Sequence, residues 1–139
     1  MAGFDGEVRG VDSADDGANI IEACIKLARD YDTVAVATGM IDTISDGTRT
    51  VQIQNGHPGL TMITGTGCML GAMTAAAAAV EKDFFQAACT AVLAMGIAGE
   101  MAALGMDQIL PGTYRARLFD SIYQLSEEDF IKAGKLTWI

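Results

Sequence analysis

Residues 63–70 read ITGTGCML and connect a flexible loop to an alanine-rich run that favours a helix. The first amides of a helix have no partners within it, so they point outward and attract negative charge. Cys68 lies at this position, where a thiol can take part in chemistry on a bound anion. The backbone of Gly65, Thr66 and Gly67 therefore indicates a site for a phosphate or another anion, with a reactive sulfur beside it.

The loop allows more than one interpretation. No Gly-Lys-Ser/Thr follows the glycines, and their spacing differs from the dinucleotide fingerprint, so neither motif is present. The loop is either an anion site or a tight turn that packs a helix against a strand. In an anion site, Cys68 either takes a proton from an attacking alcohol or acts as a covalent nucleophile, for which no histidine partner lies nearby in sequence. Cys24 and Cys89 fall in helical apolar patterns, which indicates core positions.

The elements before the loop follow from hydrophobic periodicity and turn residues. A helix is predicted over 12–30, capped by Ser13 or Asp15. The string YDTVAVATG at 31–39, with Val34 and Val36 in a short apolar run stopped by Gly39, predicts a buried strand. An Asp-Gly pair predicts the turn of a hairpin over 41–54. A helix followed closely by a buried strand is half of an α/β unit.

The elements after the loop are mainly helical. Both long apolar stretches, at 68–80 and 87–104, are interpreted as buried helices, since the first is too short to span a membrane and the second contains Glu100. Glu100 is expected to be paired or solvated, and His57, in a turn, to be structural. The predicted elements are helices over 68–80, 84–104 and 113–125 with Pro111 at the start of the third, a short turn capped near Ser126, and a strand over 135–139.

Composition narrows the class of protein. The 139 residues, half of them hydrophobic, predict a single domain over 1–139. A net charge of −9 argues against nucleic acid and against an anionic membrane as partners. The beginning of the sequence has no apolar signal core, and three cysteines without CxxC spacing indicate reduced thiols, so a cytoplasmic location is expected. One histidine and no HExxH or paired CxxC predict no metal-ligand cluster.

The predicted inventory holds few strands for its helices to cover, because an α/β sheet usually has more. Two explanations remain open. Either partner chains complete the sheet, or the sequence is the C-terminal part of a larger fold.

Several strings resemble the C-terminal half of the hydroxyethylthiazole kinase family, a thiamine-salvage branch of the ribokinase-like superfamily. The resemblance runs in order from about residue 6 to residue 125, and the segment from NGH to TGTGCML is highly specific. The strings are RGVDS, VAVATG, ISDG, NGHPGLTMITGTGCMLGA, GIAGEMAA and LPGTYRARLFDSIYQL.

The resemblance implies a ribokinase-like three-layer α/β/α sandwich, of which this chain is the C-terminal portion, and a homotrimer with active sites between subunits. It implies transfer of the ATP γ-phosphoryl group, with Mg²⁺, to the hydroxyl of 4-methyl-5-(2-hydroxyethyl)thiazole. Gly65, Thr66, Gly67 and Cys68 match the anion hole, and Cys68 the position of the general base. Thr38 matches an ATP-contacting residue, and Gly65 also matches a substrate-contacting one.

The family's N-terminal half has no counterpart in this sequence. In the family that half supplies most of the thiazole pocket, several strands, and the residues that manage phosphates and magnesium. The resemblance therefore leaves two functions open: an active kinase, or a catalytically silent half that binds nucleotide or only assembles with a partner chain. An unrelated reactive-thiol enzyme is a third possibility.

Overall fold

The computed structural model describes residues 8–9, 12–13 and 17–139. These residues form two compact units. The first contains the described residues up to Ile53 together with Leu136–Ile139, and the second contains Gln54–Lys135. That residues 1–139 form a single domain stays a prediction.

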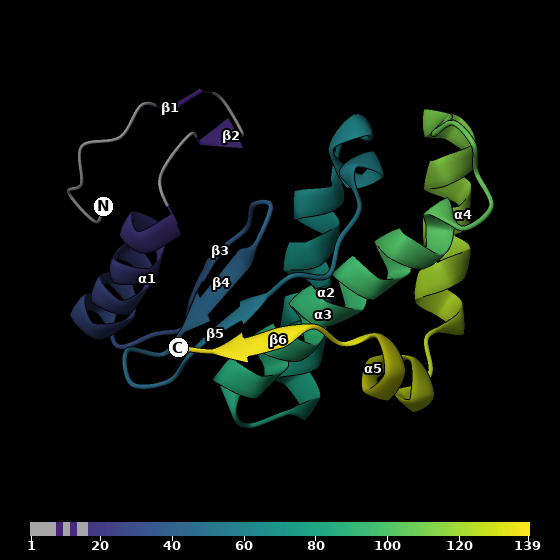
Figure 1. The fold of residues 1–139 in the computed structure, drawn as a ribbon. Coiled ribbons are helices and arrows are strands. Elements are labelled where there is room, and N and C mark those ends of the chain that lie inside the picture. Colours follow the sequence, from purple (N-terminus) through teal and green to yellow (C-terminus); the bar gives the residue numbers. More distant parts are fainter. Residues whose placement is uncertain (1–7, 10–11, 14–16) are drawn as a thin grey trace. The chain divides into compact units, whose positions relative to one another are not determined.

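The first unit is a four-stranded antiparallel sheet with a helix, α1 (Gly17–Tyr31), that contacts its strands β3 and β4 (Figure 1). Val36, Ile44, Val51 and Trp138 form one row across the sheet. A separate antiparallel pair joins β1 (Val8–Arg9) and β2 (Asp12–Ser13). The strands of the sheet, in spatial order, are β3 (Ala35–Ala37), β4 (Asp42–Ser45), β5 (Thr50–Ile53) and β6 (Leu136–Trp138).

The predicted hairpin is confirmed as β4 and β5, and Asp46 explains why the chain turns there. Its carboxylate accepts hydrogen bonds from the backbone N–H groups of Thr48, at 2.9 Å, and Arg49, at 2.6 Å. Burial raises the pKa of Asp46, but these hydrogen bonds and those from the two side chains outweigh it, so the pKa lies well below its usual range. Arg29 of α1 donates from Nε to the carbonyl oxygen of Gly47 at 2.7 Å, which fastens the turn to the helix.

Two predictions for this unit need correction. The helix predicted over 12–30 begins at Gly17, since residues 12–13 pair as a strand; Asp15, one candidate cap, lies outside the described residues. Ser, Asp and Gly compete with helix formation, which fits the later start. The strand predicted within 31–39 exists as β3 but is not buried: Val36 is 38% exposed, because β3 is an edge strand of the sheet. Cys24, predicted as core, is buried.

The second unit is helical, as predicted, and the predicted boundaries hold within two residues for its three long helices. Pro111 is the first residue of α4, where its missing N–H costs nothing. The Ser126 backbone N–H donates to the Asp129 carboxylate at 2.9 Å, so the predicted cap opens a short helix. Its elements are the 3-10 helix η1 (Pro58–Met62), α2 (Thr66–Val80), α3 (Phe84–Ala103), α4 (Pro111–Gln124) and α5 (Glu127–Ala133).

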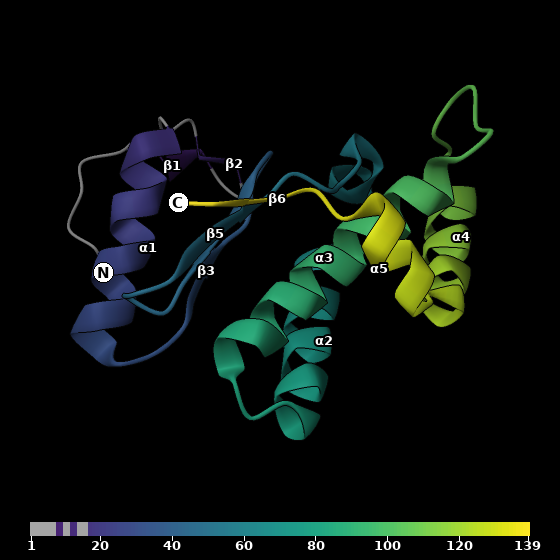
Figure 2. The same cartoon turned by 60° about the horizontal axis from the view of Figure 1, so that its bottom comes forward.

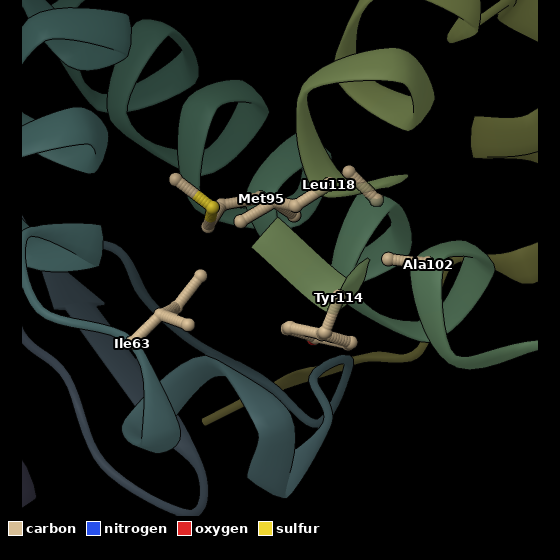
Figure 3. Packing of buried hydrophobic residues seen from close by; sticks show 6 residues of the cluster. Ile63, Met95, Ala102, Tyr114 and Leu118 are labelled. Carbon is tan, nitrogen blue, oxygen red and sulfur yellow. The ribbon is translucent and has the colours of Figure 1, made fainter. Parts of the chain in front are cut away.

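The core of the second unit forms around α3, of which thirteen residues are buried. Figure 3 shows Ile63, Met95, Tyr114 and Leu118 gathered between α3, α4 and the loop before α2. Tyr114 is fully buried, and its hydroxyl donates to the carbonyl oxygen of Gly99 at 3.0 Å. Burial raises the pKa of Tyr114 to about 12, so the hydroxyl keeps its proton.

The two apolar stretches, 68–80 and 87–104, differ in how far they are buried. α3 is long and apolar enough to cross a membrane by length and composition, but most of it is buried inside the protein, as predicted for a core helix. The prediction that 68–80 is a buried helix is wrong: α2 packs along α3 (Figure 2) but has no buried residue. An apolar run predicts that a helix will be covered, and it does not say whether this chain supplies the cover.

Candidate functional site

The candidate site lies where the loop 63–65 becomes helix α2. Gly65 caps the helix with φ +98°, a left-handed conformation that favours glycine, and Thr66, Gly67 and Cys68 form the first turn. The first helical bond runs from the Met69 N–H to the Gly65 carbonyl oxygen at 2.9 Å. Within the described part of the chain, the N–H groups of residues 66–68 have no recorded acceptor. Three adjacent amides at the positive end of a helix are therefore available to an anion.

Cys68 lies in this turn and is exposed to solvent. The Cys68 sulfur is therefore accessible, whereas Cys24 is a buried core residue. The first turn of α2 contains no acidic residue and no side-chain cap, so no carboxylate of that turn competes with an incoming anion. The local geometry of Gly65, Thr66, Gly67 and Cys68 is thus that of an open helix N-terminus with a thiol at its rim.

The loop is held in place by η1. The Thr66 hydroxyl donates to the carbonyl oxygen of Leu60 at 3.1 Å. At the other end of η1, the Gly59 N–H donates to Nδ1 of His57 at 3.0 Å, so the expectation of a structural turn histidine is confirmed. Gly59 faces the ring of Tyr114 so closely that a Cβ on it would lie 2.7 Å from Cζ. Residues of the core thereby fix the position of the loop 63–65.

A polar cluster anchors the start of the same segment. Asn55 is almost completely buried; its Nδ2 donates to the carbonyl oxygen of Ala133 at 2.8 Å, and its Oδ1 accepts from the Lys135 N–H at 2.7 Å. Glu100 accepts from the Gly56 N–H at 3.0 Å and from Lys135 Nζ at 3.1 Å. The expectation that Glu100 is paired is confirmed. The role of Asn55 was not predicted, because its partners lie far away in the sequence.

Thr38 belongs to the first unit, whereas Gly65, Thr66, Gly67 and Cys68 are consecutive residues of the second. Thr38 is exposed and follows β3 directly. In the adjoining turn, the Gly39 N–H donates to Oδ1 of Asp42 at 2.9 Å. Burial raises the pKa of Asp42 to about 6, although this hydrogen bond lowers it. This raised pKa could not be predicted from the sequence, since a turn aspartate is ordinarily solvated.

The described residues contain no group of three or more His, Cys, Asp or Glu side chains placed to hold a metal ion. A divalent cation such as Mg²⁺ prefers carboxylate, carbonyl and phosphate oxygens. The residues present therefore do not fit a dedicated protein site for magnesium in this part of the chain.

These features define a mixed α/β protein in which a glycine loop precedes a helix whose N-terminus is open. Comparison with known proteins gives the family. A family model described as the hydroxyethylthiazole kinase family matches residues 1–128, and the chain belongs to that family.

Related proteins agree with this assignment. The chain is 48% identical over 139 residues to a hydroxyethylthiazole kinase of Clostridium novyi (strain NT), covering 100% of this chain and 52% of that protein. It is 45% identical over 138 residues to hydroxyethylthiazole kinase 1 of Clostridium botulinum (strain Hall), covering 99% of this chain and 52% of that protein. The chain thus spans about half the length of the curated relatives it matches.

A solved structure extends the likeness to the fold. The hydroxyethylthiazole kinase from Pyrococcus horikoshii OT3 superimposes with a TM-score of 0.83 and 33% identity, over 88% of this chain and 47% of that one. The arrangement of helices and strands described above is therefore that of part of a thiazole kinase.

Proposed function

We propose that this chain carries the phosphoryl-transfer site of a hydroxyethylthiazole kinase. In this proposal the γ-phosphoryl group of ATP moves to the hydroxyl of 4-methyl-5-(2-hydroxyethyl)thiazole, in thiamine biosynthesis or salvage. Membership of the kinase family supports the reaction class. The observation that carries the assignment of the site is the exposed thiol of Cys68 in the same helical turn as three amides without recorded acceptors.

The proposed step uses the residues of the loop directly. Cys68, as thiolate, takes the proton of the substrate hydroxyl while that oxygen forms its bond to the γ-phosphorus and the bond from phosphorus to the ADP oxygen breaks. The amides of Thr66, Gly67 and Cys68 face the phosphoryl oxygens and stabilise the negative charge on the group in transit. Gly65 contacts the substrate, and Thr38 contacts ATP. Positioning and electrostatics supply most of the rate enhancement in such a transfer.

Magnesium accompanies ATP in this class of reaction and neutralises phosphate charge. Because the described residues do not fit a dedicated magnesium site, no step of the proposal is assigned to the ion. Its remaining ligands would be phosphate oxygens, water and residues outside this part of the fold.

The proposal also includes the complete fold, the oligomeric state and the cellular location. They are a ribokinase-like three-layer α/β/α sandwich, of which this chain forms the C-terminal portion, a trimer with shared active sites, and a cytoplasmic location. The matching relatives are about twice as long as this chain, which supports the idea that the sandwich needs further polypeptide.

The test of catalysis replaces Cys68 in the chain joined to the complementary half of the Clostridium novyi relative. Cys68→Ala should lower kcat by about 10²- to 10⁴-fold, the range for loss of a general base, and Cys68→Asp should restore much of the activity. Cys89 is a half-buried cysteine of α3. Cys89→Ala is the matched control and should leave kcat nearly unchanged. Full activity in Cys68→Ala would rule out the proton-transfer role.

The alternative is a catalytically silent half that binds nucleotide or only assembles with a partner. The length of the relatives supports this alternative, since this chain covers only 52% of the Clostridium novyi protein. Calorimetry on the 139-residue chain with Mg-ATP, followed by a thiazole phosphorylation assay, separates the two. Nucleotide binding without product, in the chain alone and in the joined protein, would support the silent module.

A further inference from the structure

His57 caps the 3-10 helix η1 with its side chain as well as its backbone. Nδ1 of His57 accepts a hydrogen bond from the Gly59 N–H at 3.0 Å, and the His57 carbonyl oxygen accepts one from the Leu60 N–H at 2.9 Å. The side-chain bond has the form that an asparagine or aspartate makes as an N-cap. η1 therefore begins at a side chain whose ability to accept a hydrogen bond depends on its protonation.

The bond from Gly59 fixes the tautomer of the His57 ring. A backbone amide only donates, so Nδ1 presents its lone pair and carries no hydrogen. The ring that makes this bond is neutral, with its hydrogen on Nε2. A ring protonated at both nitrogens has two donors and no acceptor, so it would leave the Gly59 N–H without its partner. His57 is half-buried, so its ring exchanges protons with solvent.

The same short helix holds the first turn of α2. The Leu60 carbonyl oxygen accepts a hydrogen bond from the Thr66 hydroxyl at 3.1 Å. Leu60 also packs on α3 so closely that a Cβ on Gly99 would lie 2.9 Å from its Cδ1. Leu60 directly follows the capped residue Gly59, so a loss of the cap acts on Leu60 within the same turn of η1. The cap at His57 is thereby connected to Thr66.

The groups around His57 leave its ring free to respond to protons. The Tyr114 ring of α4 lies with its centroid 5.9 Å from that of His57, and the Tyr114 hydroxyl donates to a backbone carbonyl of α3. On α3, Glu100 accepts from the N–H of Gly56 at 3.0 Å and from Nζ of Lys135 at 3.1 Å. Among the described residues, none forms an ion pair with His57, so no carboxylate holds the ring in its charged form.

We propose that His57, neutral and with its hydrogen on Nε2, is a positioning residue for the first turn of α2. It holds Gly59 and η1, and through the Leu60 carbonyl it holds Thr66 and the amides that follow. When the ring gains a proton, the cap is lost and the turn is released. Histidine ordinarily changes charge between pH 5 and pH 8, so the turn should respond to pH in this range. The effect on the turn stands by itself, whereas the effect on catalysis rests on the proposed function.

The first test is nitrogen-15 NMR of the 139-residue chain. At pH 8 the His57 ring nitrogens should show the tautomer with hydrogen on Nε2. Titration to pH 5 should lower the protection of the Gly59 amide against hydrogen exchange by about tenfold or more, and the amide resonances of Thr66 and Gly67 should shift along the same titration. A hydrogen on Nδ1 at pH 8, or an unchanged protection of Gly59, would overturn the proposal.

Two substitutions separate the hydrogen bond from the presence of a polar side chain. His57→Asn offers an amide oxygen close to the place of Nδ1 and does not ionise, so Gly59 and Thr66 should behave alike at pH 5 and pH 8. His57→Gln is the matched control, since its amide oxygen lies one methylene farther from the backbone and misses the Gly59 N–H. It should show the released turn at both pH values. Equal behaviour of the two variants would overturn the proposal.

The second test measures catalysis in the chain joined to the complementary half of the Clostridium novyi relative. The readout is the ratio of kcat in the original protein to kcat in His57→Asn, because both proteins share the pH dependence of Cys68. The ratio should be near one at pH 8 and about tenfold lower at pH 5, and His57→Gln should be slow at both values. A constant ratio in an active kinase would overturn the positioning role. An inactive original protein would contradict the proposed function, and the NMR result alone would then decide the role of His57.

Discussion

The hydroxyl of Thr66, the first residue of α2, donates a hydrogen bond of 3.1 Å to the carbonyl oxygen of Leu60 in η1. This bond ties the rim of the candidate site to the segment before it. The amides of Thr66, Gly67 and Cys68 keep their direction only if this turn does, because a displacement of about 1 Å in such a site costs up to 10²-fold in rate.

Thr66→Val removes this bond and keeps the shape of the side chain. The free energy of unfolding should fall by about 1 kcal/mol, since the Leu60 carbonyl loses its partner. In the chain joined to the complementary half of the Clostridium novyi relative, kcat should fall by about 10- to 100-fold. Urea unfolding and steady-state kinetics measure the two effects. Thr66→Ser, which keeps the hydroxyl, should stay close to the original protein, and a loss as large as that of Thr66→Val would show that the hydroxyl is not the cause.

Gly67→Ala tests whether an anion approaches the backbone. A Cβ on Gly67 would meet nothing within 4 Å, and alanine favours a helix, so stability should stay the same or rise by up to about 1 kcal/mol. Activity and phosphate affinity should nevertheless fall, because the new methyl group occupies the space of the anion.

Gly112→Ala is the matched control for that variant. Gly112 is also the second residue of a helix, α4, and a Cβ there would likewise meet nothing within 4 Å. It should change stability in the same way and leave activity unchanged. Equal activity in Gly67→Ala and Gly112→Ala would argue against anion binding at the α2 turn.

The parts of the fold that depend on neighbouring residues could be predicted from the sequence. Asp46 and Gly47 predict the hairpin because the turn is made by their own hydrogen bonds and dihedral angles. Pro111 marks the start of α4, and Gly65–Cys68 are consecutive, so their geometry at a helix N-terminus is also local.

The remaining features depend on residues far apart in the sequence. The pairing of β5 with β6 joins Val51 to Trp138, and the Asn55 side chain bonds to Ala133 and Lys135. No periodicity signals such pairs. The exposure of α2 could not be predicted either, because the sequence pattern reports what the whole protein buries, and this chain spans about half of its relatives.

Gly59→Ala should destabilise the second unit. A Cβ at this position would lie 2.7 Å from Cζ of Tyr114, whose ring is fully buried and cannot retreat without moving its neighbours. Overpacking of this kind costs about 1–3 kcal/mol, so the melting temperature should fall by several degrees. Gly71→Ala, which meets nothing within 4 Å in an exposed part of α2, should not lower it. An equal melting temperature for both variants would contradict close packing of Gly59 on Tyr114.

Asp42 should make the stability of the protein depend on pH. Burial raises its pKa to about 6 from the ordinary value of 3.8, so the folded state holds the proton more tightly than the unfolded state. Stability is therefore lost as the pH rises between these two values, and above about pH 6 the loss is complete. Asp42→Asn keeps an oxygen for the Gly39 N–H but cannot ionise. Because the side chain is partly exposed and screened by solvent, the variant should gain only about 1–2 kcal/mol over the original chain between pH 4 and pH 7. Urea unfolding across this range measures the difference, and parallel stability curves for the two chains would contradict the raised pKa.

Asp46→Asn should show the opposite trend. The low pKa of Asp46 stabilises the original chain at neutral pH, and that advantage over the variant disappears as the pH falls below about 4.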